Sequence, residues 1–405
     1  MNLTRKQHFF TILILGSLAT ISPFSIDMYL PGFPAIAKDL GTSVAQVELS
    51  LTAYLIGIAV GQLLYGPLLD RYGRKRPLYA GLIVYIVASF FCAYTSTVEN
   101  LIALRFLQAL GGCVGMVAAQ ALIRDIFPIS ETAVALSSLT LVIAVSPMVA
   151  PTVGGYLTAS VGWPYVFVLL GIITLVITAT VVFFLPKGKD ADPEISLAPR
   201  VVLKSFRKVV THQQFALYAL AGGISTSASF AYIGGSSDVI INLYGFTEQQ
   251  YGWIFAFLAA GLIGSSQLNQ LLLKRLTSEQ LIRTALLYQS VTGIILVLGT
   301  WQHWFGPAIF IGLMFIFLTG QGLVNPNATA LTLAPFHRHI GSAASLNGFI
   351  RMSVGGLVTA LVSVFHNGTE VPMVGVMAFC VISGLLLILS RPYWLKPSAT
   401  ADTDL

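Results

Sequence analysis

Long apolar segments recur along the chain, and short polar stretches separate them. Each segment has about the length, near 20 residues, that a helix needs to cross the hydrocarbon core of a bilayer. The pattern therefore predicts an all-α membrane protein with twelve spanning helices. Their approximate bounds are 9–31, 46–69, 77–95, 101–123, 132–158, 164–185, 214–236, 249–273, 281–300, 307–333, 341–365 and 371–390.

The longest polar stretch divides the spans into two sets of six. We predict an N-terminal six-helix half at 1–185, a linker loop at 186–213, a C-terminal six-helix half at 214–390 and a tail at 391–405. Aligning the halves so that Gln46 meets Gln249 also places Gly61 on Gly264. Weak similarity between halves is typical of secondary transporters, whose substrate sites lie between the halves near the bilayer midplane.

The amino-acid composition is also that of a membrane protein. Of the 405 residues, 56% are hydrophobic and 9% are charged, whereas about a quarter of a soluble protein is charged. A set of soluble domains and a disordered chain are both excluded. The cysteines Cys92, Cys113 and Cys380 fall in apolar segments, so we expect no disulfide framework.

The positions of the cations predict the sidedness. Nineteen of the 22 lysines and arginines lie in alternate connections, and the opposite side has only Lys38. Arg105 and Arg351 fall within apolar segments. Because cytoplasmic loops are rich in Lys and Arg, both termini and the 186–213 linker are predicted to be cytoplasmic. The net charge of +6 thus reflects membrane topology and does not indicate nucleic-acid binding.

The turn after the second span carries the most informative motif, Gly66-Pro-Leu-Leu-Asp-Arg-Tyr-Gly-Arg-Lys-Arg-Pro-Leu78. Glycine permits close helix approach and a tight turn. One acid among several cations predicts a charge latch that breaks and reforms during transport, although an ordinary positive loop with one acid is the alternative. The predicted latch consists of Gly66, Asp70, Arg71, Gly73, Arg74 and Lys75.

This turn matches the G-x-L-x-D-R-x-G-R-K/R signature, and the chain thereby resembles the major facilitator superfamily. The run from Arg105 to Gly111 is similar to its R-x-x-x-G motif with different spacing. The run from Ala150 to Gly155 is similar to the G-P-x-x-G-G motif of antiporters, one glycine short. The equivalent turn in the second half has Leu273 where the first has Asp70.

Residues 25–34 and 124–128 resemble the Bcr/CflA-type drug:proton antiporters. The resemblance implies a major facilitator fold in the bacterial inner membrane and export of drug-like molecules by alternating access, conferring antibiotic resistance. It implies no cofactor, because the proton motive force supplies the energy. The expected partners are a small-molecule substrate, protons and the bilayer, and we expect a functional monomer.

The span at 132–158 contains four residues that affect helix packing: Pro147, Pro151, Gly154 and Gly155. Proline removes backbone donors and glycine leaves room, which predicts a kink and tight contact with a neighbouring helix. The alternative is the ordinary enrichment of proline and glycine in membrane helices.

Two charges at membrane depth are the proton-coupling candidates, Asp27 and Arg105, and we expect Arg105 to be the direct partner that neutralises Asp27. A charge there costs free energy and so requires an explanation. Burial raises the pKa of a carboxyl and a nearby cation lowers it, so alternation between these surroundings would bind and release a proton. The alternatives are a hydrated carboxylate near the periplasmic surface and a fixed structural ion pair of Arg105.

Other polar residues in the apolar segments are candidates for a substrate cavity. They are Tyr29, Tyr54, Gln62, Gln108, Asp238, Asn325, Asn347 and Arg351. For the tyrosines, the alternative is a role in helix packing. For Asp238, the alternative is a position in the headgroup zone of the bilayer. Asn325, Pro326 and Asn327 are expected to interrupt the span at 307–333, since broken backbone at membrane depth lines cavities.

Motifs for other functions are missing from the sequence. It contains no G-x-x-x-x-G-K-S/T, H-E-x-x-H or G-x-S-x-G run, so neither an ATPase nor a metal site is expected, and an intramembrane enzyme is a remote alternative. Nothing resembles a repeated pore loop of a channel. Export of an endogenous metabolite, such as an amino acid or sugar, and proton-coupled nutrient import both remain open.

Overall fold

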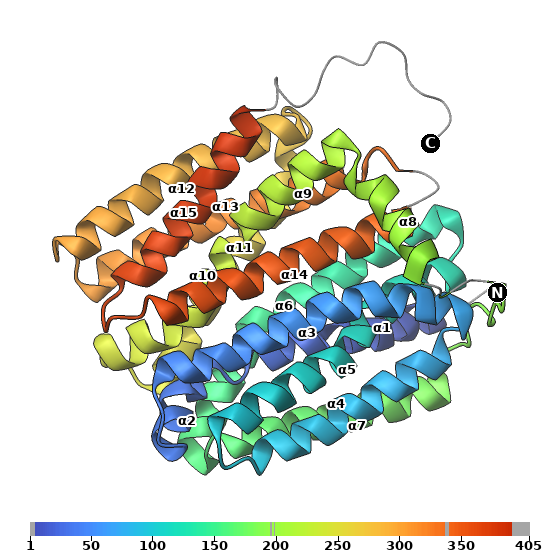
Figure 1. Ribbon diagram of the computed structural model, residues 1–405, viewed down its shortest axis with the longest axis horizontal. Coiled ribbons are helices and arrows are strands. Elements are labelled where there is room, and N and C mark those ends of the chain that lie inside the picture. Colours follow the sequence, from blue (N-terminus) through green and yellow to red (C-terminus); the bar gives the residue numbers. More distant parts are fainter. Residues whose placement is uncertain (1–4, 195–196, 198, 337–339, 391–405) are drawn as a thin grey trace. The chain divides into compact units, whose positions relative to one another are not determined.

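The computed structural model describes residues 5–194, 197, 199–336 and 340–390, so the predicted tail at 391–405 lies outside the described residues (Figure 1). Twelve helices in these ranges are long and apolar enough to cross a membrane, which confirms the predicted number. The same ranges contain no β-strand. The chain divides into two compact units, which are described separately.

The first unit comprises Met1–Leu197 and Phe246–Ala256. Its elements are α1 (Arg5–Asp27), η1 (Leu30–Gly32), α2 (Phe33–Asp39), α3 (Val44–Arg71), α4 (Lys75–Ala93), α5 (Val98–Ile126), α6 (Ile129–Val161) and α7 (Pro164–Phe184). Helix α5 is central, because α1, α3 and α4 all pack against it. Helices α4 and α7 lie side by side, and α1 packs against α6 (Figure 1).

The second unit comprises Ala198–Gly245 and Phe257–Leu405. Its helices are α8 (Pro199–Val210), α9 (Gln213–Thr226), α10 (Ala228–Ser237), most of α11 (Glu248–Leu272), α12 (Ser278–Trp301), α13 (Pro307–Leu333), α14 (Ile340–Val364) and α15 (Val371–Leu389), and a π-helical turn, η2 (Asp238–Leu243), follows α10. Helix α9 packs against α13 and α15, and α12 packs against α13 and α15.

The first span is divided more finely than its apolar pattern suggests. Helix α1 ends at Asp27, and the short elements η1 and α2 continue to Asp39. Pro31 and Pro34 stand at the starts of η1 and α2. Proline lacks an N–H and is favoured in the first turn of a helix, where that N–H would have no partner, so the two prolines suit new helix starts.

The predicted interruption at Asn325 to Asn327 is wrong, because α13 is one helix from Pro307 to Leu333 with Pro326 inside it. The side-chain amide of Asn327 donates hydrogen bonds to the carbonyl of Leu323 (2.8 Å) and to Asn269 Oδ1 (2.6 Å). The bond to Asn269 anchors the turn that contains Pro326 to α11.

The predicted linker loop contains a helix, α8. The apolar residues of this stretch are interrupted by four cations, Arg200, Lys204, Arg207 and Lys208, so the stretch lacks the long apolar run of a span. Val209 is buried and Leu203 is exposed on this short helix. It ends two residues before α9 begins.

Candidate functional site

Arg105 lies on α5 and is completely buried in the first unit. Its guanidinium donates one hydrogen bond to Gln108 Oε1 (2.5 Å) and one to the backbone carbonyl of Ser25 (2.8 Å). Ser25 is in the last turn of α1, where carbonyls have no intrahelical N–H partner. A cation at this end of a helix also interacts favourably with the helix dipole, so Arg105 caps α1.

Two tyrosine rings flank the same guanidinium. Its central carbon lies 3.9 Å from the ring centroid of Tyr54 and 4.1 Å from that of Tyr29. Cations are attracted to the faces of aromatic rings, and more strongly where water is excluded. The positive charge of Arg105 is therefore stabilised by a carbonyl, an amide and two rings. The tyrosines that the sequence suggested as cavity residues surround this charge.

A chain of hydrogen bonds extends from Gln108. Its side-chain amide donates to Ser89 Oγ (2.7 Å), and that hydroxyl donates to the carbonyl of Tyr85 (2.7 Å). The hydroxyls of Tyr85 and Ser25 also bond to each other. Ser89 and Tyr85 were not identified in the sequence, because a serine and a tyrosine in an apolar helix give no local signal of a polar cluster.

Asp27 is the last residue of α1, two positions beyond Ser25, and its side chain is buried with 4% exposure. Within the described residues its carboxyl has no ion pair or hydrogen bond, to Arg105 or to any other group. The direct partnership expected from the sequence is therefore not seen. Arg105 instead positions the helix end that carries Asp27.

Gln62 lies on α3, eight positions after Tyr54, and is half-buried. It makes no hydrogen bond within the described part of the chain. Of the four cavity candidates in this unit, Tyr29, Tyr54 and Gln108 thus meet at Arg105, and Gln62 lies outside that cluster.

The predicted charge latch contains a further acid from a distant part of the chain. Arg74 donates to Asp70 Oδ1 (2.5 Å) and, through Nε and Nη2, to both carboxylate oxygens of Asp125 (2.7 and 3.3 Å). The backbone N–H of Lys189, in the linker, donates to Asp125 Oδ2 (2.9 Å). Burial lowers the pKa of Arg74, but the hydrogen bonds to Asp125 and Asp70 outweigh it and hold the pKa above its ordinary value.

The other predicted latch residues surround this network. Gly73 has φ +79°, a left-handed conformation that favours glycine, and forms the turn between α3 and α4. Arg71 and Lys75 lie over the rings of Tyr72 and Tyr79, at 5.9 and 6.0 Å from the centroids. Gly66 is half-buried one turn before Asp70 on α3.

Gly154 and Gly155, the two glycines predicted to affect packing in the span at 132–158, lie at close backbone contacts on α6. A Cβ at Gly154 would collide with the carbonyl of Met28, directly after Asp27. A Cβ at Gly155 would collide with the carbonyl of Glu248, at the start of α11. Pro147 and Pro151 both lie inside α6. The motif thus brings α6 against the end of α1 and the first turn of α11.

In the second unit, Asp238 begins the π-helical turn η2. Its carboxylate accepts a hydrogen bond from the amide of Asn242 (2.7 Å) and lies 3.3 Å from Nε2 of His366, an ion pair when that histidine is protonated. Asn347 is buried, whereas Asn325 and Arg351 are half-buried. No described contact joins these three residues to Asp238.

A neutral counterpart of the Arg105 contact occurs in the second unit. The amide of Gln321, on α13, donates to the backbone carbonyl of Ser225 near the end of α9 (2.9 Å). Sequence reasoning missed Gln321, because a lone glutamine in an apolar helix is not costly enough to require a function. In each unit a long side chain therefore bonds the final turn of a neighbouring helix, but only Arg105 brings a charge.

Comparisons with known proteins agree with this architecture. Residues 15–360 match the sequence profile of the Major Facilitator Superfamily. The chain is 32% identical over 388 residues to the bicyclomycin resistance protein homolog of Haemophilus influenzae, covering 94% of this chain and 96% of that protein. It is 28% identical over 375 residues to the multidrug resistance protein MdtL of Escherichia coli O81, covering 92% and 93%.

Among solved structures, a D-xylose-proton symporter matches with a TM-score of 0.73 and 14% identity over 96% of this chain and 98% of that one. A bacterial homologue of the human lysosomal transporter Spinster matches with a TM-score of 0.72 and 13% identity over 97% of both chains. At these identities the two structures show the fold alone. With its twelve spans, this is a multi-pass transporter of the bacterial inner membrane. The chain belongs to the major facilitator superfamily and, within it, to the Bcr/CflA-type transporters.

Proposed function

We propose that the chain exports drug-like small molecules from the cytoplasm in exchange for protons. The observation that carries the proposal is the placement of Asp27, a buried carboxyl with no cation partner among the described residues, at the end of a helix that Arg105 holds. A carboxyl at membrane depth is costly as a charge and is retained where a function needs it. The names of two relatives, a bicyclomycin resistance homologue and a multidrug resistance protein, support drugs as the substrate class.

The proposed cycle uses Asp27 as the proton carrier. Burial favours the neutral, protonated carboxyl, and access to water or to a cation favours the ionised one. In the outward-open state Asp27 takes a proton from the periplasm. Rocking of the two halves then exposes it to the cytoplasm, where substrate binding favours release of the proton. Arg105 supplies a positive charge at the end of α1.

We also propose the orientation of the chain in the membrane and the energy source of export. The nineteen cations in alternate connections support a cytoplasmic location of both termini and of the linker. The proton motive force drives export without a cofactor, and one chain is sufficient for it. Export of an endogenous metabolite and proton-coupled nutrient import use the same kind of carboxyl, but the names of the relatives do not favour them.

Proton coupling is tested with Asp27→Asn in everted membrane vesicles containing a pH-sensitive dye. We expect substrate-driven proton release with the wild type and none with Asp27→Asn. Asp190→Asn, an exposed acid of the linker, is the matched control and should behave as the wild type. Undiminished proton release by Asp27→Asn would remove Asp27 from the mechanism.

The substrate class is tested by a drug-susceptibility panel in a strain that lacks its native pumps. Expression of the wild type should raise the tolerated concentration of at least one amphipathic drug, and Arg105→Ala should abolish that increase. If expression raises the tolerated concentration of no compound, the drug-export proposal fails, and metabolite export or nutrient import becomes the better explanation.

A further inference from the structure

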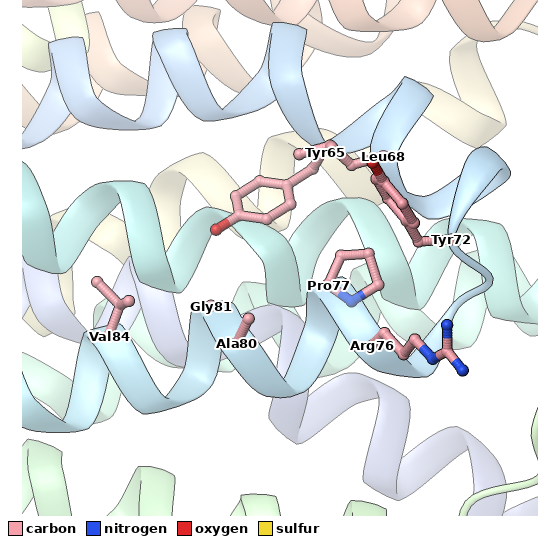
Figure 2. Close-up of a pocket in the computed structure, with 8 residues that line it drawn as sticks. All are labelled: Tyr65, Leu68, Tyr72, Arg76, Pro77, Ala80, Gly81 and Val84. Atoms are coloured by element: carbon pink, nitrogen blue, oxygen red, sulfur yellow. The ribbon is translucent and has the colours of Figure 1, made fainter. Parts of the chain in front are cut away.

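A groove of about 380 Å³ lies between α3 and α4 at the end where Gly73 connects them. Tyr65 and Leu68 on α3 line it, together with Tyr72 directly after that helix. Figure 2 shows Arg76 at the connected end and Val84 at the other end, with the groove running along α4 between them. Its wall is thus apolar or aromatic along its length and cationic at one end.

The groove exists because α3 and α4 both pack onto α5 more extensively than onto each other. Gly81 forms part of its floor on α4. A Cβ there would lie 2.7 Å from a Val114 methyl and 2.9 Å from the hydroxyl of Tyr65. The Tyr65 ring extends from α3 toward Gly81 at this point (Figure 2). The hollow is therefore built into the helix packing.

Arg76 differs from the neighbouring cations in its partners. Arg74 is bound by Asp70 and Asp125, and Lys75 lies over the ring of Tyr79. Arg76 is exposed and forms no ion pair within the described residues. Its charge is therefore available to a ligand in the groove.

We propose that the groove binds one anionic glycerophospholipid, with an acyl chain beside Leu68, Ala80 and Val84 and the phosphate against Arg76. Because α3 and α4 are spanning helices, the bilayer supplies the occupant of a groove along them. The groove is apolar and ends at the cation Arg76, so it complements a lipid whose apolar acyl chain ends at an anionic headgroup. Tyr72, at the cationic end, suits the headgroup level, where amphipathic rings concentrate.

The site would place a lipid beside the charge latch, since Arg76 is two residues from Arg74. This inference is independent of the exported substrate and of the role of Asp27. The lipid site lies in the leaflet nearest the turn at Gly73. In the proposed topology this is the cytoplasmic leaflet.

The test is native mass spectrometry of the purified full chain titrated with phosphatidylglycerol in detergent. We expect one tightly bound lipid per chain and about fivefold weaker binding in Arg76→Gln, the effect typical of one cation near an anionic lipid surface. Lys75→Gln removes the adjacent cation, which does not line the groove, and should bind as the wild type. Equal binding by Arg76→Gln and Lys75→Gln would overturn the proposal, as would equal affinity for phosphatidylcholine.

A second pair of variants tests the apolar part of the site. Ala80→Phe should fill the groove and reduce phosphatidylglycerol binding, whereas Ile83→Phe, exposed on the same helix but outside the groove, should not. Displacement of the lipid from the wild type by an exported drug would assign the groove to the substrate and overturn the lipid proposal.

Discussion

Arg105 donates a hydrogen bond of 2.8 Å to the backbone carbonyl of Ser25, so a buried arginine of α5 holds the end of α1. This contact sets the position of Asp27, two residues further on, without an ion pair between the two charges. The equivalent bond in the second unit, from Gln321 to Ser225, is neutral. Of these two contacts, the charged one lies in the unit that carries Asp27.

Arg105→Lys should lower the export rate at least tenfold even though it keeps the positive charge. Lysine has a compact ammonium group and cannot serve both Ser25 and Gln108 while lying flat between two rings. Leaving such buried groups without partners costs about 1–3 kcal/mol of stability. Export is measured in everted vesicles and normalised to the amount of protein in the membrane.

Arg124→Lys is the control for that substitution, because Arg124 is exposed on the same helix. Full export by Arg105→Lys would mean that the charge alone matters and that capping of α1 does not.

In the latch, Asp125→Ala should destabilise the protein more than Asp70→Ala. Asp125 accepts two hydrogen bonds from Arg74 and one from the linker, whereas the side chain of Asp70 accepts one and is 47% exposed. Exposed pairs contribute about 0–1 kcal/mol, and hydrogen bonds to charged groups contribute about 1.5–3 kcal/mol. The two apparent melting temperatures in detergent provide the comparison, and the reverse order would contradict this account of the latch.

Gly154→Ala should impair folding and export, because the new methyl group meets the backbone carbonyl of Met28, which cannot rotate away as a side chain would. Overpacking of this kind costs about 1–3 kcal/mol. Gly375→Ala, on α15, is the matched control, since a Cβ there meets nothing within 4 Å. The yield of folded protein by size-exclusion chromatography measures both, and equal yields would show that α6 does not need this contact.

His212, between α8 and α9, should make stability fall at acid pH. Burial lowers its pKa below the ordinary 6.5, so the folded protein binds this proton less readily than the unfolded chain. Its contribution to stability is therefore complete above pH 6.5 and declines as the pH falls below that value. Melting temperatures from about pH 8 to about pH 5 should fall more steeply for the wild type than for His212→Gln. Parallel curves for the two proteins would exclude this histidine as the cause.

The spans and their number followed from the sequence, because the cost of exposing polar backbone to lipid forces about 20 apolar residues into each crossing. Local helix ends were harder to predict. Pro31 and Pro34 start new elements after Asp27, whereas Pro326 lies inside α13 and Pro147 and Pro151 lie inside α6. The same residue type has opposite effects because contacts from neighbouring helices can hold a membrane helix together across a proline, and the local sequence does not show those contacts.

The linear chain thus determined the membrane fold, the proposed sidedness and the residues whose charge is costly in lipid, since each depends on composition or local spacing. Tertiary structure decided which of those charges meet. Asp125 joins the latch from 51 residues away, and Arg105 reaches Ser25 across 80 residues instead of pairing with Asp27. Such contacts depend on which faces of separate helices pack together, and apolar spans that are hydrophobic on all sides do not encode that choice in their periodicity.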